Sequence, residues 1–159
     1  MKPFKLVTSV LILLFAFQQT SSAETYRDQI QLLIDKGQLQ QALELADEQI
    51  VQDDSDIRLL FMKGLILTRM DDLDNAAELF VRMTNEHPEL PEPFNNLAVI
   101  YALKGEFDKA EEALQKAINT HPSYATAHEN LGDLYAKMAS QAYNQALELD
   151  QDNKSAREK

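Results

Sequence analysis

The sequence contains no cysteine and no tryptophan, and it has only four glycines and five prolines among 159 residues. Without cysteine there can be no disulfide bond, thiolate metal site or cysteine nucleophile. Glycine and proline interrupt helices, so their scarcity favours an all-α chain. Basic residues are also few, since 15 Lys and Arg stand against 26 Asp and Glu, for a formal charge of −11. Such a surface repels nucleic acid and anionic lipid, and we expect neither as a partner.

The segment 1–23 differs in composition from the rest of the chain. A short basic start precedes an uninterrupted run, Leu6–Phe17, that is almost entirely apolar, and the small residues Ser21 and Ala23 then suit a processing site. This is the layout of a secretory signal peptide. A membrane-spanning helix needs about 20 apolar residues, so an uncleaved anchor is the weaker alternative. We predict a signal peptide at 1–23, cleavage after Ala23, no membrane contact after cleavage, and an exported, periplasmic protein.

Sequence patterns recur at a constant interval in the remainder of the chain. The tetrapeptide NEHP at 85–88 returns as NTHP at 119–122, which predicts that both His-Pro pairs lie in turns. Small residues recur at the same interval, at Gly64, Ala98 and Gly132 and at Ala42, Ala76 and Ala110. These positions allow paired helices to approach closely. Each interval therefore predicts a pair of helices whose apolar sides are buried only against neighbouring pairs, as in a stacked solenoid.

The repeat resembles the tetratricopeptide repeat (TPR), a pair of antiparallel helices of about 34 residues in total. The third repeat carries the resemblance most fully, with Phe94, Leu97, Ala98, Tyr101, Ala110, Leu114, Ala117 and Pro122. The resemblance implies a right-handed α-solenoid of about three and a half helix hairpins over 24–153. We place its repeats near 23–56, 57–90 and 91–124, with a degenerate one at 125–153. The segment 154–159 resembles the start of a truncated or frayed further helix.

The pattern predicts six helices before the degenerate repeat. We expect them near 25–36, 39–52, 56–69, 73–86, 91–104 and 107–120. Tight turns are expected within each hairpin, at Lys36-Gly37, Met70–Asp72 and Lys104–Glu106, because Gly and Asp residues suit such turns.

The fourth repeat is shorter than the others. The stretch from Gly132 to Ala146 lacks five residues relative to the equivalent stretch of the third repeat, from Ala98 to Ala117. The missing length is about that of the turn between two paired helices. We therefore predict one continuous helix over about 125–149, with a tight hairpin capped by Ser140 as the alternative. A fused helix cannot fold back, so Met138, Tyr143 and Leu147 would form an assembly surface for a second copy or for a segment outside this sequence.

No Ser-His-Asp arrangement, metal-ligand spacing or phosphate-binding glycine loop is present, so we expect no enzyme, no cofactor and no metal site. The TPR resemblance instead implies a concave groove, lined by the first helix of each repeat, that binds a protein or peptide partner. The residues at groove positions are Arg27, Gln31, Arg58, Phe61, Leu65, Arg69, Asn95, Val99, Leu103 and Glu129. The sequence thus predicts an exported TPR adaptor. The alternative is an N-terminal structural or assembly module of a larger cell-envelope protein, with the fused helix as its contact.

Overall fold

The computed structural model describes residues 25–159, and every regular element in that range is an α-helix. The predicted signal peptide at 1–23 lies outside the described residues. The contacts between residues divide the chain into two compact units, one ending at Asp71 and the other beginning at Asp72. The first unit contains the first predicted hairpin and the second contains the third, and the boundary falls in the turn of the second hairpin.

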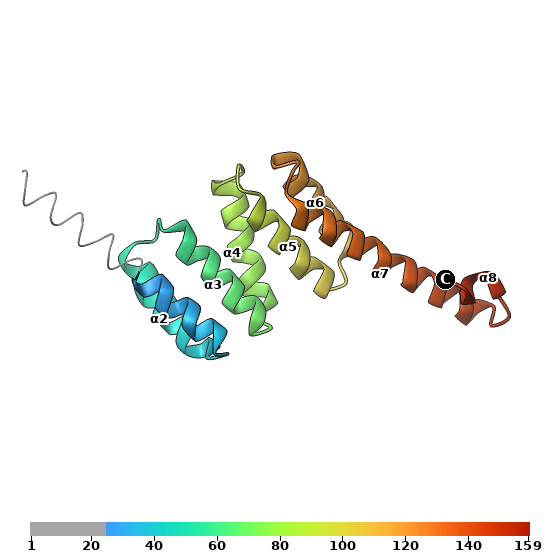
Figure 1. Ribbon diagram of the computed structural model, residues 1–159, viewed down its shortest axis with the longest axis horizontal. Coiled ribbons are helices and arrows are strands. Elements are labelled where there is room, and N and C mark those ends of the chain that lie inside the picture. The colour runs from blue at the N-terminus through green and yellow to red at the C-terminus, as the bar shows by residue number, and fades with distance from the viewer. Residues whose placement is uncertain (1–24) are drawn as a thin grey trace, which may run out of the picture. The chain divides into compact units, whose positions relative to one another are not determined.

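The first unit contains three helices in its described part (Figure 1). A helical segment over 25–35 is followed by α2 (Leu39–Gln52) and α3 (Ile57–Arg69). Their apolar sides form one core, because residues from all three helices are buried together. Its buried members are Ile30, Ile34, Ala42, Ala46, Leu59 and Ile66.

The second unit contains five helices, α4 (Leu73–Glu86), α5 (Pro91–Leu103), α6 (Phe107–Thr120), α7 (Ala125–Leu149) and α8 (Lys154–Arg157). The α5–α6 hairpin is its most closely packed pair, and α4 and α7 pack on either side of that hairpin. The main core of this part joins α5, α6 and the first half of α7. Its buried members are Ala98, Ala110, Ala113, Leu114, Ala117, Ala127 and Leu134.

The turn inside each hairpin recurs with the period of the repeat, as the sequence predicts. Gly37, Asp71 and Gly105 all have a positive φ, of 72°, 63° and 76°. At Gly105 the backbone N–H donates to Ala102, and the next N–H, of Glu106, donates to Tyr101 at 2.8 Å. This pair of bonds closes a helix through a residue in the left-handed region, which glycine occupies without strain.

The two histidines of the His-Pro pairs lie in turns, as predicted. His87 follows the last residue of α4 and His121 follows the last residue of α6. In both turns the histidine carbonyl accepts a bond from the N–H three residues on, from Leu90 and from Tyr124. Each Pro then prevents the helix from continuing, so the chain turns into the next repeat.

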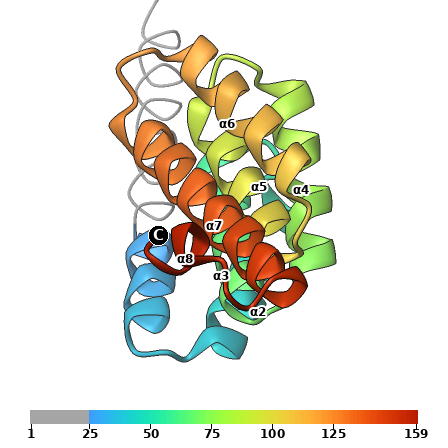
Figure 2. The ribbon, with the colours of Figure 1, turned by 90° about the vertical axis from the view of Figure 1, so that its right-hand side faces the viewer.

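The degenerate repeat is a single helix. α7 runs without interruption from Ala125 to Leu149, which confirms the predicted continuous helix and excludes the hairpin alternative. Figure 2 shows α7 as one rod with α8 turned back at its end. The prediction that Gly132 admits a closely packed helix is wrong within the described chain, because a Cβ built there would meet nothing within 4 Å. The physical reason is that the second half of α7 continues straight on instead of folding back.

Candidate functional site

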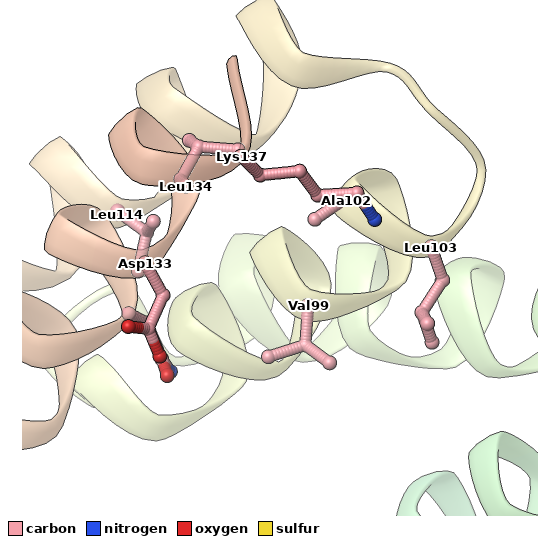
Figure 3. A pocket seen from close by; sticks show the side chains of 8 residues that line it. Val99, Ala102, Leu103, Leu114, Asp133, Leu134 and Lys137 are labelled. Carbon is pink, nitrogen blue, oxygen red and sulfur yellow. The ribbon is translucent and has the colours of Figure 1, made fainter. Parts of the chain in front are cut away.

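A pocket of about 170 Å³ opens between α5 and α7. Its lining comes from α5, from α7 and from one residue of α6, as Figure 3 shows. The eight lining residues are Val99, Ala102, Leu103, Leu114, Asn130, Asp133, Leu134 and Lys137. Two of the predicted groove residues, Val99 and Leu103, are therefore brought together on one helix face. Leu103 is 58% exposed, whereas the other apolar residues of α5 are buried or half-buried.

The pocket has an apolar floor and charged side chains at its α7 wall. Asp133 and Lys137 are one helical turn apart on α7 and both are exposed. The Lys137 ammonium lies 5.7 Å from the centre of the Phe107 ring, a cation–π distance. An apolar surface of this kind can hold an apolar side chain of a ligand. The carboxylate and the ammonium at its border can hydrogen-bond the ligand's backbone on either side of that side chain.

Behind the pocket, α5 and α7 are joined by two asparagines. Asn95, a predicted groove residue, is only 5% exposed. Its Oδ1 accepts a hydrogen bond from Asn130 Nδ2 at 2.7 Å. A buried amide needs such a partner, because leaving it unpaired costs about 1–3 kcal/mol. In this structure Asn95 therefore positions α7 against α5 behind the pocket rather than lining it.

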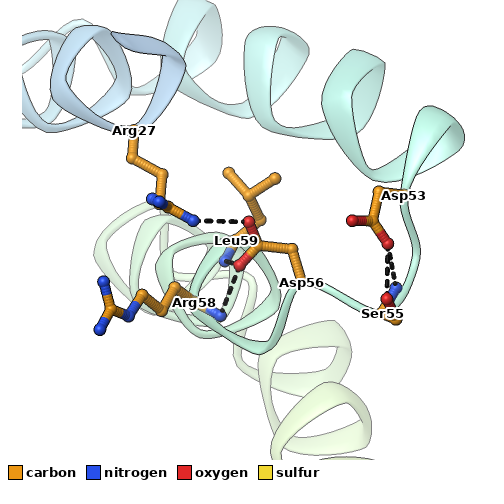
Figure 4. A network of polar contacts seen from close by, with 6 residues as sticks. All are labelled: Arg27, Asp53, Ser55, Asp56, Arg58 and Leu59. Carbon is orange, nitrogen blue, oxygen red and sulfur yellow. Dashed lines mark hydrogen bonds and ion pairs between the residues drawn. The ribbon is translucent and has the colours of Figure 1, made fainter. Parts of the chain in front are cut away.

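In the first unit, Arg27 pairs with the residue that caps α3 (Figure 4). The Asp56 carboxylate accepts hydrogen bonds from the backbone N–H groups of Arg58 and Leu59, at 3.0 and 3.2 Å. Its other oxygen accepts from Arg27 Nη1 at 2.8 Å. Both side chains of this ion pair are half-buried. Arg27 thus ties the first helix to the start of α3.

The other predicted groove residues of this unit lie on its first and third helices. Gln31 is exposed and donates to Asp35 at 2.8 Å. Arg58 and Arg69 are exposed at opposite ends of α3, and Phe61 and Leu65 are half-buried between them. The apolar residues among the predicted groove positions come from both units. Phe61 and Leu65 belong to the first and Val99 and Leu103 to the second, where Glu129 is also exposed, on α7.

The predicted assembly surface lies on α7. Met138 is half-buried against the core, Tyr143 is 37% exposed, and Leu147 is half-buried. Nearby, the Tyr135 hydroxyl donates to Glu111 Oε1 of α6 at 2.6 Å. That hydrogen bond to a carboxylate raises the pKa of Tyr135 above its ordinary value.

Lys137 is one of the pocket residues that the predicted groove set does not contain. In the fourth repeat the predicted groove residues end at Glu129, because the repeat breaks soon afterwards. The repeat itself identifies Lys137, because Lys137 occupies the repeat position that Arg69 and Leu103 hold in the two preceding repeats. The break falls just after this position, so the first helix of the repeat is complete.

Comparisons with known proteins agree with this architecture. Residues 100–138 match the family model described as TPR repeat. The solved structure of YrrB, described as a TPR protein with an unusual peptide-binding site, is similar, with 29% identity and a TM-score of 0.61. The match covers 64% of this chain and 52% of YrrB, so this chain spans about half of that protein's length. No curated protein matches the chain.

Two further solved structures share the fold. MamA from Desulfovibrio magneticus is 20% identical, with a TM-score of 0.63 over 82% of this chain and 77% of that one. The Yersinia enterocolitica type III secretion chaperone SycD, solved with a peptide of the translocator YopD, is 18% identical. Its TM-score is 0.66 over 74% of this chain and 95% of that one. The chain is therefore a helical-hairpin repeat protein. Residues 100–138 match a tetratricopeptide repeat, and the helical hairpins have the fold of TPR proteins, as the sequence predicted.

No group of three or more His, Asp or Glu side chains among residues 25–159 lies close enough to hold a metal ion. No helix in the same range has both the length and the apolar character needed to cross a membrane.

Proposed function

We propose that the protein is an adaptor that binds a segment of another protein, and that the pocket between α5 and α7 is the contact. The observation that carries this proposal is the apolar surface of half-buried Val99 and exposed Leu103 beside Asp133 and Lys137. Exposed apolar patches commonly mark contacts with a partner. The peptide-binding site ascribed to YrrB and the peptide seen with SycD support the same use.

The pocket's chemistry defines the class of ligand. An apolar side chain of the partner would occupy the space over Val99, Ala102 and Leu103. Asp133 accepts hydrogen bonds from backbone N–H groups, and Lys137 donates to carbonyl or carboxylate oxygens. We therefore expect an extended or helical peptide with an apolar anchor residue and polar neighbours, bound without chemical conversion.

Export is part of the proposal. The segment 1–23 has the composition of a signal peptide, and we place the mature protein in the periplasm after cleavage following Ala23. Cell fractionation and mass measurement of the exported chain test this step. A chain that begins at Met1 in the membrane fraction would instead support the uncleaved anchor.

The second candidate function is an assembly module of a larger cell-envelope protein. The observation that favours it is the second half of α7, which is exposed from Ala139 to Gln145. The two functions predict different effects of mutation on assembly and on peptide binding. Met138→Asp with Leu147→Asp would abolish assembly and spare peptide capture, whereas a charged pocket variant would do the reverse.

A peptide-display library selected on the chain from Glu24 onward tests the adaptor function. Val99→Arg introduces a charge into the pocket, and we expect at least a tenfold loss of affinity for the selected peptides, about 1.4 kcal/mol. Val51→Arg is the matched control, because Val51 is 89% exposed on α2, a helix that contributes no residue to the pocket lining. Calorimetry on both variants gives the comparison. Equal affinities in the two variants would refute the pocket as the site.

A further inference from the structure

The residue pattern of α6 recurs in the second half of α7, at a shorter interval than the period of the repeat. Ala110, Ala113 and Ala117 of α6 recur with the same mutual spacing on the second half of α7, as Ala139, Ala142 and Ala146. The helix boundaries are displaced by the same amount. α6 ends at Thr120 and α7 begins at Ala125, while α7 ends at Leu149 and α8 begins at Lys154.

The hydrogen bonds of the following turn recur as well. The Tyr124 N–H donates to the His121 carbonyl, and at the equivalent place after α7 the Asn153 N–H donates to the Asp150 carbonyl. The second helix of the fourth repeat is therefore present in full. Only the turn that would separate it from the first helix is missing, and the five absent residues correspond to 104–108 of the third repeat.

The first half of α7 is not covered by the second helix of its own repeat, because that helix continues straight on as the second half of α7. In the third repeat Ala98 is 1% exposed and lies in one core with the alanines of α6. Its equivalent on α7 is Gly132, beside which a Cβ would find open space. The alanines that would cover Gly132 lie further along the same rod. A continuous helix cannot fold back on itself, so only a second chain can supply them.

The uncovered residues form one stripe along α7. They stand at alternating intervals of three and four residues, at Gly132, Tyr135, Ala139, Ala142, Ala146 and Leu149. This is the spacing of a coiled-coil seam. Five of the six are exposed, and Ala146 is half-buried near α8. Small residues on such a seam let two helix backbones come close together.

Charge favours a second copy at this place over any other. The chain carries a net charge of −11, so two copies repel one another over most of their surfaces. From Met138 to Leu147 α7 has no charged residue, although most of this stretch is exposed. Depletion of charge is typical of the centre of a protein–protein interface.

We propose that two copies of this chain exchange the second halves of α7. Each half from 139 to 149 packs along the first half of α7 in the other copy, with the two helices antiparallel. The midpoint of α7 is Lys137, and pairing centred there places Gly132 beside Ala142 of the second copy and Tyr135 beside Ala139. A connection too short to form its turn is a common origin of such exchange. The stripe shares no residue with the pocket lining, so dimerisation can be tested independently of peptide binding.

Restoring the missing turn is the decisive experiment. Inserting Lys-Gly-Glu-Phe-Asp, the sequence of 104–108, between Lys137 and Met138 returns the repeat to its full length. Sedimentation of the chain from Glu24 onward should give a dimer for the parent and a monomer for the insertion variant. The control carries the same insertion in the turn after Asp150 and should remain dimeric. A monomeric parent at tens of micromolar, or a dimeric insertion variant, would overturn the proposal.

A crosslinking experiment does not depend on how the insertion variant folds. The chain has no cysteine, so Gly132→Cys with Ala142→Cys introduces the only two thiols. On one straight helix these positions are about 15 Å apart, too far for an internal disulfide. We expect a covalent dimer on mild oxidation. Gly132→Cys with Asn144→Cys is the control, because Asn144 lies on the opposite side of α7 and should crosslink at least tenfold more slowly. Equal rates would contradict the pairing.

Discussion

At the scale of single residues, backbone conformation decides what a glycine contributes. Gly105 has a φ of 76° and closes the α5–α6 turn, whereas Gly132 lies inside α7. A Cβ at either position would meet nothing within 4 Å. Substituting alanine at both positions therefore measures how backbone conformation affects the free energy of unfolding, without a change in packing.

We expect Gly105→Ala to lower the free energy of unfolding by about 1 kcal/mol, because an L-residue in the left-handed region is strained. Gly132→Ala should raise it by about 1 kcal/mol, because alanine favours a helix interior over glycine. Alanine also stands at the equivalent position of the third repeat, as Ala98. Urea denaturation of the two variants and the parent measures both changes. Shifts of the same sign would show that packing, not backbone conformation, controls these sites.

Residue-level prediction from the sequence succeeded where the repeat constrains a residue directly. The left-handed turn positions and the capping histidines follow from the period of the repeat alone. Asn95 and Arg27 were harder to predict, because each occupies a groove position in the repeat. Their actual partners, Asn130 and Asp56, are 35 and 29 residues away. Pairing over that distance depends on the packing of particular helices, which a pattern of residue types does not encode.

At the scale of elements, the helix boundaries agree with the prediction to within one residue. The reason is that amphipathic spacing, small residues and turn residues all agree in the first three repeats. The fourth repeat was also predictable, because the loss of five residues removes a turn without disturbing the helical spacing on either side. What the sequence did not predict is that Lys137 would line a pocket immediately before that deletion.

Gln141→Pro distinguishes the continuous helix from the hairpin in solution. In a hairpin capped by Ser140, residue 141 would be the first helical position, where proline is well tolerated. Inside α7 proline removes a backbone hydrogen bond and clashes with the preceding turn, at a cost of about 3 kcal/mol. We expect loss of helical circular dichroism and of amide-exchange protection over 138–149. Gln145→Ala is the control and should leave both signals unchanged. Full protection in the proline variant would support the hairpin.

At the scale of the whole molecule, each unit has a core formed by its own helices. Of the four apolar residues at predicted groove positions, Val99 and Leu103 share a unit with α7 and line the pocket. Arg58, Phe61, Leu65 and Arg69 belong to the first unit, and their use by the same ligand remains a prediction. The repeat predicts which positions line a groove, but the depth of a pocket depends on how adjacent side chains fill it.

Net charge should also govern the stability of the whole molecule. Removal of Lys2 and Lys5 with the predicted signal peptide leaves 13 basic against 26 acidic residues, a charge of −13. The ion pairs seen in the described residues are mostly exposed, and such pairs contribute about 0–1 kcal/mol each. Repulsion among the excess carboxylates should therefore outweigh them at low salt. Raising the ionic strength from about 0.01 to about 0.15 M shortens the screening length from about 30 to about 8 Å. We expect the Tm to rise by a few degrees over this range, as measured by calorimetry at pH 7. Because screening weakens attraction and repulsion alike, a Tm that falls with added salt would mean that the ion pairs dominate. The acidic surface would then have to be paired more completely than its composition indicates.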